Sequence, residues 1–285
     1  MKLLALLPFC LALNVIAIEP ATGSKSKADQ GAADAKIKPG ERAPLSFKEG
    51  TPMAGADQLK MRLRSVEAPG ALDLSKEGYE VIIPKSYKKG APHGLFIWIS
   101  PNDKCALPPD WEKVLADHKL IFVGALKGGN NREVFSRMQL AITANDQMRQ
   151  MYDIDPARVY VSGHSGGSRV ASMLAVAYAD MFSGAVCFMG VNFFFPTQGK
   201  DGTTYEARYI PHPEIATQAQ NESRIVLVTG DKDFNQDNTK AIYEQGFQAN
   251  EFKHVKLFDI PGQGHGAPAK EWLEKALDFL EDGKK

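Results

Sequence analysis

Short apolar runs alternate with helical patterns along the chain from about residue 78. Seven runs have the length of strands: Tyr79–Pro84, Leu95–Ser100, Leu120–Leu126, Arg158–Gly163, Gly184–Gly190, Arg224–Gly230 and Val255–Pro261. Most are rich in Val, Ile, Leu and Phe and lack strict alternation with polar residues. This pattern is typical of strands that are covered on both faces of a parallel sheet.

Three segments between or after these runs have apolar residues at helical spacing: Glu133–Met151, Arg169–Asp180 and Glu271–Glu281. An antiparallel sandwich would need hairpin turns every 8–12 residues, and the sequence lacks them. The alternation therefore predicts an α/β fold with a doubly wound, mostly parallel sheet and helices on both faces. A further strand is expected at Met61–Glu67, paired with the run that begins at Tyr79.

The beginning of the chain has the pattern of a secretory signal peptide. Lys2 is followed by an apolar stretch, Leu3–Ala17, which is shorter than the roughly 20 residues that span a bilayer. We therefore expect cleavage after Ala17, a secreted or periplasmic protein, and no stable membrane span. Residues 18–44, rich in small and charged residues, predict a solvated linker, and residues 45–285 a single domain.

Composition narrows the choice of function. The chain of 285 residues carries 34 basic and 34 acidic side chains and no dense basic block, which gives nucleic-acid binding little electrostatic support. After signal cleavage Cys105 and Cys187 remain, and export would permit a disulfide between them, whereas the apolar run around Cys187 suits a buried thiol. No metal-ligand spacing of the H-x-x-x-H or C-x-x-C kind occurs, so neither a metal nor another cofactor is expected.

The strongest chemical signal is a G-x-S-x-G motif, Gly163-His164-Ser165-Gly166-Gly167, between a strand and a helix. A serine at such a tight turn has strained backbone angles, and neighbouring positions come too close for side chains. The turn would expose the Ser165 hydroxyl as a nucleophile at a helix N-terminus, with the Gly166 N–H as an oxyanion donor. His164 is expected at the rim of the site, packing there or touching substrate.

A serine hydroxyl needs a base to act as a nucleophile. In hydrolases with this strand–turn–helix motif, called a nucleophile elbow, the acid and then the histidine follow later strands. His265 comes after the last run and is the predicted base. Asp231 and Asp233 compete for the acid after Arg224–Gly230. Asp231 stands close enough to the strand to cap its turn. Asp233 has the better reach toward the imidazole and is preferred.

Two further parts of the site are predicted from loops. The loop after Leu95–Ser100 should supply the second oxyanion donor. Because Pro101 has no N–H, Asn102 is the first choice and Asp103 the next. The long connection 191–223 contains three consecutive phenylalanines. If this connection covers the site, Phe194 and Phe195 would bind an acyl or aromatic group of the substrate. In the alternative interpretation, the aromatic run completes the core.

At these residues the chain resembles the α/β-hydrolase superfamily and, within it, secreted polyhydroxybutyrate depolymerases, feruloyl esterases and acetylxylan esterases. The likeness covers about residues 78–281 and is most specific in the Asp-Pro-x-Arg-Val-Tyr-Val lead, residues 155–161, before the elbow. Where that group has His-Gly, this chain has Ser100-Pro101.

The resemblance implies a serine esterase with Ser165 as nucleophile, His265 as base and Asp233 as acid. It would act on a small-molecule or polymeric ester, such as a plant-polysaccharide acyl ester or a polyester. A peptidase or an acyltransferase could use the same three residues. A non-catalytic binding protein on the same scaffold is a further alternative.

Overall fold

A central sheet of eight strands organises residues 37–65 and 69–283, the part of the chain that the computed structural model describes. In chain order the strands are β1 (Arg42–Leu45), β2 (Tyr79–Ile82), β3 (His93–Ile99), β4 (Leu120–Ala125), β5 (Ile154–His164), β6 (Gly184–Phe188), β9 (Arg224–Gly230) and β10 (His254–Ile260). Their order across the sheet is β1-β2-β4-β3-β5-β6-β9-β10. Only the β1–β2 and β2–β4 pairs are antiparallel, so the predicted mostly parallel sheet is confirmed.

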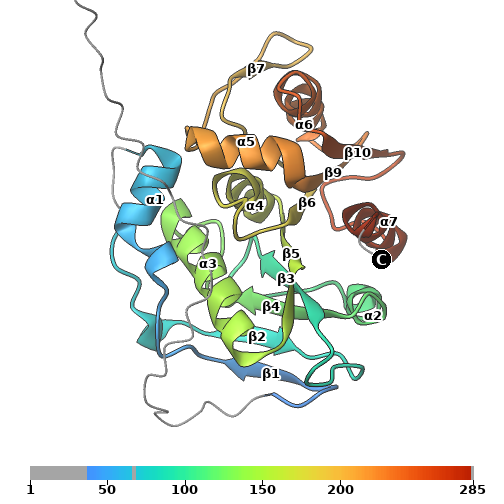
Figure 1. Ribbon diagram of the computed structural model, residues 1–285. Coiled ribbons are helices and arrows are strands. Elements are labelled where there is room, and N and C mark those ends of the chain that lie inside the picture. Colours follow the sequence, from blue (N-terminus) through green and yellow to red (C-terminus); the bar gives the residue numbers. More distant parts are fainter. Residues whose placement is uncertain (1–36, 66–68, 284–285) are drawn as a thin grey trace, which may run out of the picture. The chain divides into compact units, whose positions relative to one another are not determined.

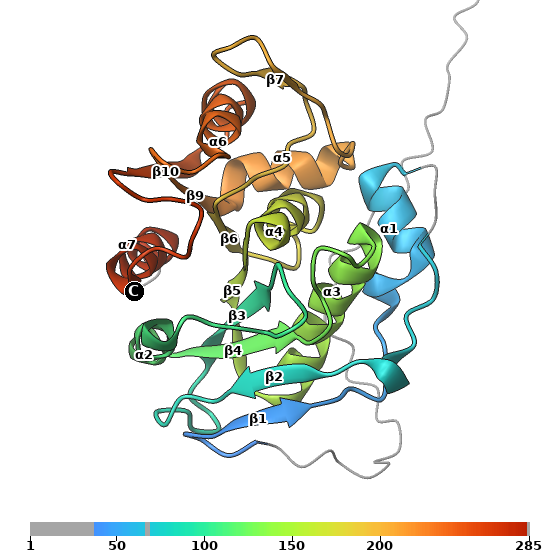
Figure 2. The ribbon, with the colours of Figure 1, turned by 180° about the vertical axis from the view of Figure 1, so that it is seen from behind.

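Helices cover both faces of this sheet (Figures 1 and 2). They are α1 (Ala56–Leu63), α2 (Pro109–Asp117), α3 (Val134–Met151), α4 (Gly166–Ala177), α5 (Pro213–Glu222), α6 (Gln236–Ala241), which continues as a π-helix (Ile242–Gln248), and α7 (Lys270–Glu281). Helices α1, α3, α4 and α5 lie on one side, and α2 and α7 lie on the other. Single 3₁₀ turns occur at Pro52–Ala54 and Leu74–Lys76, and a small hairpin pairs β7 (Thr197–Gln198) with β8 (Thr204–Tyr205).

The unbroken apolar runs follow from the two buried faces. Along β3, Leu95, Ile97 and Ile99 belong to the hydrophobic cluster under α3 and α4. The intervening Phe96 and Trp98 belong to a second cluster with residues of α2 and α7. Successive side chains of a strand point to opposite faces, so a strand between two helical layers is apolar at every position.

The prediction of a strand at Met61–Glu67 is wrong. Residues up to Leu63 form α1, in which Leu59 and Leu63 are buried at helical spacing, and Arg64 ends the helix with a φ of 45°. The antiparallel partner of β2 is instead β1, which begins at Arg42. The folded domain thus starts before residue 45, because Ile37 is also buried and its N–H donates to Tyr152 Oη. The predicted signal peptide and the linker up to residue 36 lie outside the described residues.

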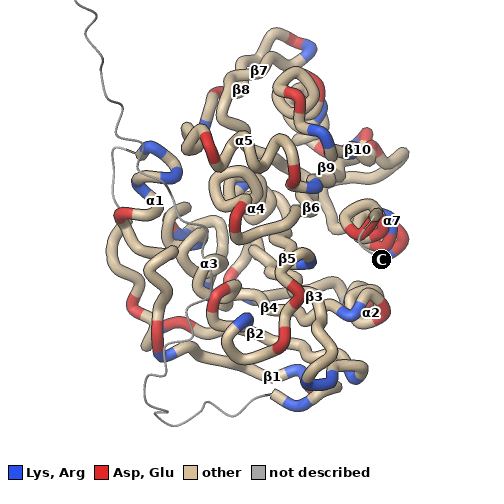
Figure 3. Tube along the Cα trace, in the orientation of Figure 1, with Lys and Arg blue, Asp and Glu red and all other residues tan. Residues whose placement is uncertain are grey.

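The two cysteines lie on opposite faces of the sheet. Cys187 belongs to the cluster under α3 and α4, and Cys105 to the cluster under α2 and α7. Both are free and buried, so the disulfide that export would permit does not form. Burial raises the pKa of each thiol to about 12. Acidic and basic residues are interspersed along the trace (Figure 3), and no helix of the described residues is long and apolar enough to cross a membrane.

Candidate active site

Ser165 occupies the tight turn between β5 and α4, with φ 55° and ψ −121°. Its N–H donates to Phe188 O at 2.9 Å, and its own carbonyl accepts the first bond of the helix. A Cβ on Gly163 would lie 2.4 Å from the Gly167 carbonyl carbon, and one on Gly167 would lie 1.9 Å from Ile99 O. Glycine is therefore required at both positions, and the surrounding backbone holds the strained serine in place.

Three side chains from the carboxyl ends of three strands form one hydrogen-bonded chain. His265, after β10, has Nε2 2.9 Å from Ser165 Oγ and Nδ1 2.7 Å from Asp233 Oδ1. Because a carboxylate only accepts, Nδ1 carries the proton and Nε2 is free to accept from the hydroxyl. The structure thus brings together the nucleophile, base and acid that the sequence predicts.

The carboxylate of Asp233 is buried and fully engaged. Its Oδ2 accepts from Thr229 Oγ1 at 2.9 Å, and its Oδ1 accepts from the Asn235 N–H at 3.1 Å as well as from His265. The rival Asp231 is exposed, and its Oδ1 accepts from the Gly262 N–H at 2.7 Å. Asp231 therefore ties two loops together, and Asp233 orients the imidazole.

The loop that carries His265 has two aromatic neighbours. His164 Nε2 donates to the main-chain carbonyl of His265 at 2.7 Å, and burial lowers the pKa of His164, which keeps its ring neutral. Phe234 stacks on the His265 ring with centroids 3.9 Å apart and is 77% exposed. The sequence prediction placed His164 at the rim, either packing there or touching substrate. The structure uses it instead to hold the His265 backbone.

The structure does not support the prediction that the Asn102 N–H is the second oxyanion donor. The Asn102 N–H donates to Ser100 Oγ at 3.2 Å, so it is occupied within its own loop. The loop also binds the one after β4, because Asp103 accepts from the Gly129 N–H through its carboxylate and from the Lys127 N–H through its carbonyl. Gly166, the first residue of α4, keeps its predicted place beside the nucleophile.

A buried arginine that the sequence prediction missed joins the loops around the nucleophile. Arg137 of α3 donates to the carbonyl oxygens of Gly128 (2.8 Å), Ser100 (3.0 Å) and Gly166 (3.3 Å). Burial lowers its pKa to about 10. The one sequence signal that could have pointed to Arg137 is its place in the first turns of a helix, where the helix dipole disfavours a positive charge.

A cavity of about 700 Å³ includes Arg169, which lies one turn of α4 beyond Ser165, although none of the three residues of the hydrogen-bonded chain lines it. Its lining is aromatic and apolar, with Phe135, Met173 and Tyr209 among its residues, and it also includes Arg64, Arg169 and Arg208. No carboxylate of the described residues forms an ion pair with any of these three arginines.

Arg169 connects the cavity to the hydrogen-bonded chain. It donates to Asn235 Oδ1 at 3.0 Å, and the Asn235 N–H in turn donates to Asp233. Burial, and next the charge of Arg208, lower the pKa of Arg169, which indicates that the two guanidinium groups share this region.

The phenylalanine run does not form an open pocket. Phe194 is 8% exposed and packs in the core with Phe252 and Tyr209, so its expected role as a substrate contact is wrong. Phe195 is 47% exposed and stacks on Phe194 with centroids 4.7 Å apart. Phe193 and Phe194 therefore complete the core, which was the alternative interpretation, and Phe195 lies exposed beside them. No cluster of metal-ligating side chains occurs within residues 37–65 and 69–283.

Comparison with protein families gives a match over more than half of the chain. The model described as "Dienelactone hydrolase family" matches residues 71–272. Among curated proteins, poly(3-hydroxyalkanoate) depolymerase C of Paucimonas lemoignei is 42% identical over 45 residues. That stretch is 16% of this chain and 11% of the depolymerase, so the likeness concerns a short segment.

Solved structures with similar folds share little sequence with this chain. A fluorophosphonate-binding serine hydrolase F of Staphylococcus aureus gives a TM-score of 0.56 at 14% identity, covering 85% of this chain and 99% of its own. Est1E of Butyrivibrio proteoclasticus gives 0.52 at 16% identity, covering 75% and 98%. A chain described as a dipeptidyl aminopeptidase IV of Bacteroides ovatus gives 0.55 at 14% identity, but the match spans only 36% of that larger chain.

Proposed function

The chain belongs to the dienelactone hydrolase family, and on this premise we propose that it is a secreted serine esterase that acts through an acyl-enzyme on Ser165. The single observation that carries the proposal is the continuous hydrogen-bonded chain from Asp233 through His265 to the Ser165 hydroxyl. Such a chain raises the nucleophilicity of a hydroxyl that would otherwise react poorly.

In the first half-reaction, Ser165 Oγ attacks the ester carbonyl carbon as its proton passes to His265 Nε2. Asp233, already bound to Nδ1, stabilises the imidazolium that forms. The carbonyl oxygen becomes an oxyanion, and the Gly166 N–H at the start of α4 donates to it. The tetrahedral intermediate then expels the alcohol, which takes the proton from His265.

In the second half-reaction water replaces the alcohol. His265 removes a proton from the water, and the resulting oxygen attacks the acyl-enzyme carbonyl. Collapse of the second tetrahedral intermediate releases the carboxylic acid and returns the proton to Ser165. Every proton transfer thus passes through one nitrogen, Nε2 of His265, which lies 2.9 Å from the hydroxyl that it serves.

The neighbouring cavity supports a choice of substrate. Its aromatic and apolar lining suits an apolar or aromatic part of an ester. Arg208 would attract a carboxylate on that part, because no ion pair of the described residues engages it, whereas Arg169 is already bound to Val191 O, Asn192 Oδ1 and Asn235 Oδ1. We therefore favour an aromatic or aliphatic ester that carries a negative charge. Export is proposed from the sequence pattern of residues 1–17 alone.

The test begins with a fluorophosphonate probe on the full chain. Labelling of the wild type and its loss in Ser165→Ala would support the nucleophile. Hydrolysis is then compared for phenyl acetate, 4-carboxyphenyl acetate, methyl ferulate, a hydroxybutyrate ester and a peptide amide. Faster turnover of esters than of the amide supports an esterase. A preference for the amide would instead indicate a peptidase, and the absence of both labelling and turnover would reject the enzyme.

A further inference from the structure

The loop after β3 does not offer the Asn102 N–H, its expected second backbone donor, to an oxyanion. Pro101 has no N–H, and the Asn102 N–H is bound to Ser100 Oγ at 3.2 Å. Hydrolases of this elbow type normally take the second donor from this loop. A single donor, the Gly166 N–H, is a weak oxyanion hole, since each donor contributes strongly to the rate.

A side-chain amide lies beside the remaining donor. If Gly166 carried a Cβ, that atom would lie 2.2 Å from Asn130 Oδ1 and 3.1 Å from Asn130 Nδ2. The amide of Asn130 thus occupies the space that the missing side chain leaves, next to the residue that follows the nucleophile. Among the described residues no group accepts a hydrogen bond from this amide, so its N–H groups are free for a ligand.

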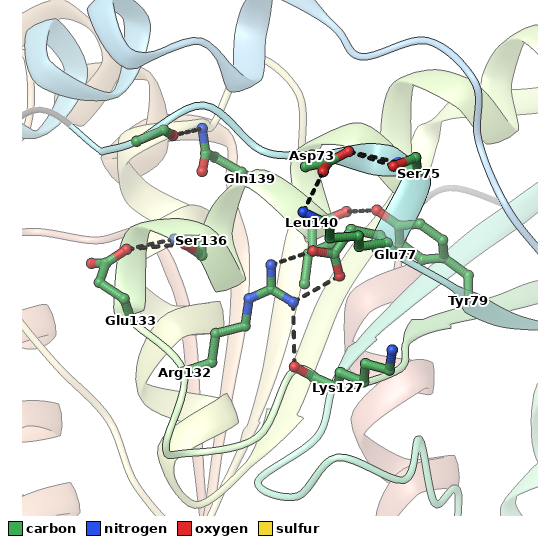
Figure 4. A network of polar contacts seen from close by, with 12 residues as sticks. Asp73, Ser75, Glu77, Tyr79, Lys127, Arg132, Glu133, Ser136, Gln139 and Leu140 are labelled. Carbon is green, nitrogen blue, oxygen red and sulfur yellow. Dashed lines mark hydrogen bonds and ion pairs between the residues drawn. The ribbon is translucent and has the colours of Figure 1, made fainter.

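The loop that carries Asn130 is held at several points. The Asn130 N–H donates to Pro101 O at 3.0 Å, and the preceding Gly129 N–H donates to Asp103 Oδ1 at 3.0 Å. Two residues further on, Arg132 makes a paired contact with the buried Glu77 carboxylate (Figure 4), with distances of 2.7 and 2.5 Å. These contacts fix the backbone of the loop that carries the amide beside Gly166.

We propose that the Asn130 side-chain N–H is the second oxyanion donor of this enzyme. The proposal rests on the ester hydrolysis proposed above. As Ser165 Oγ bonds to the carbonyl carbon, the carbonyl π pair moves onto oxygen, and the proton passes to His265. Asn130 Nδ2–H and the Gly166 N–H donate to that oxygen until the pair returns and the carbon–alcohol bond breaks. The Asn130 side chain is exposed and makes no hydrogen bond among the described residues, so its amide can turn to present Nδ2 to the oxygen.

The test compares Asn130→Ala and Asn130→Asp with the matched control Asn131→Ala, which removes the same amide from the neighbouring exposed position. We expect kcat on phenyl acetate to fall about 10²-fold to 10³-fold in both Asn130 variants, with KM little changed. Asn131→Ala should keep the wild-type rate. Thermal unfolding of all three proteins checks that the fold is retained.

A thionoester substrate distinguishes a hydrogen-bond donor role of Asn130 from a purely structural role. Sulfur accepts hydrogen bonds poorly, so the wild type should strongly prefer the oxygen ester over its thiono analogue. That preference should shrink at least tenfold in Asn130→Ala if the amide donates to the reacting oxygen. Equal losses on the two substrates, or a rate within threefold of wild type, would overturn the proposal. A wild type that reacts with neither ester nor fluorophosphonate would instead reject the esterase itself.

Discussion

The imidazole of His164 donates from Nε2 to the main-chain carbonyl oxygen of His265 at a distance of 2.7 Å. The residue before the nucleophile thereby holds the backbone of the base, 101 positions later in the chain. Removing this donor should let the His265 loop drift and lengthen the contact with Ser165. His164→Ala should lower kcat/KM about tenfold, and His164→Gln, which retains an N–H donor, should recover most of the loss. Equal activity of the alanine variant and wild type would contradict this role.

Protonation of His164 makes the free energy of unfolding depend on pH. Burial lowers the pKa of His164 below its ordinary 6.5, so the unfolded chain takes up a proton at a higher pH than the folded chain does. Stability from the neutral ring is present above about pH 6.5 and is lost as the pH falls. Urea unfolding at pH 7.5 and 5.5 should therefore show a larger drop for wild type than for His164→Gln. His93, whose pKa burial also lowers, titrates equally in both proteins.

Two aspartates of one loop should differ sharply in their effect on activity. Asp233→Asn keeps the shape of the side chain but no longer favours the imidazole tautomer with its proton on Nδ1, so kcat should fall about 10⁴-fold. Asp231→Ala removes only the bond to the Gly262 N–H and should cost about 1 kcal/mol of stability with little loss of kcat. Steady-state kinetics and urea unfolding distinguish the two. The reverse order of effects would assign the acid to Asp231.

Two adjacent glycines should respond differently to alanine. Gly166→Ala places a methyl group against the Asn130 amide, and because this exposed side chain can turn aside, we expect at most about 1 kcal/mol of destabilisation. Adding Asn130→Ala to that variant should restore most of the stability. Gly167→Ala places its methyl group 1.9 Å from the main-chain oxygen of Ile99, and the second substitution should not rescue it. Denaturant unfolding of the four variants would show whether the rescue is confined to position 166.

The exposed arginine of the cavity offers a test of substrate charge. Arg208 lines the cavity, and only its backbone N–H makes a hydrogen bond among the described residues. Arg208→Gln should raise KM for 4-carboxyphenyl acetate about fivefold and leave phenyl acetate unaffected, because one exposed charge contributes about 1 kcal/mol. Added salt should reduce the difference in the wild type. An equal change in KM for both esters would indicate that Arg208 shapes the cavity and does not act through its charge.

The sequence predicted the parallel sheet and the three residues of the hydrogen-bonded chain because each depends on a local pattern. The glycines at 163 and 167 indicate a turn that brings backbone segments close together, and this requirement is visible from residue types alone. Asp233 and His265 stand directly after apolar runs whose ends must meet at one edge of a parallel sheet.

What the sequence could not predict depends on contacts between distant segments. The Asn102 N–H lost its expected role to the neighbouring Ser100 hydroxyl, and Asn130 gained a place beside Gly166 from a loop one strand away. The short strand β1 was hidden in a polar segment, since at the edge of the sheet Arg42 and Pro44 remain exposed and need no apolar pattern. Arg137 was missed because three carbonyl oxygens from separate loops have no signature in sequence.

The position of the two cysteines on opposite faces of the sheet makes the folded domain insensitive to redox conditions. Because a full layer of strands separates Cys105 from Cys187, oxidation cannot join them in the native fold. Their buried, protonated thiols also present little thiolate to oxidants or to glutathione. A reducing agent should therefore leave the stability of the folded domain unchanged.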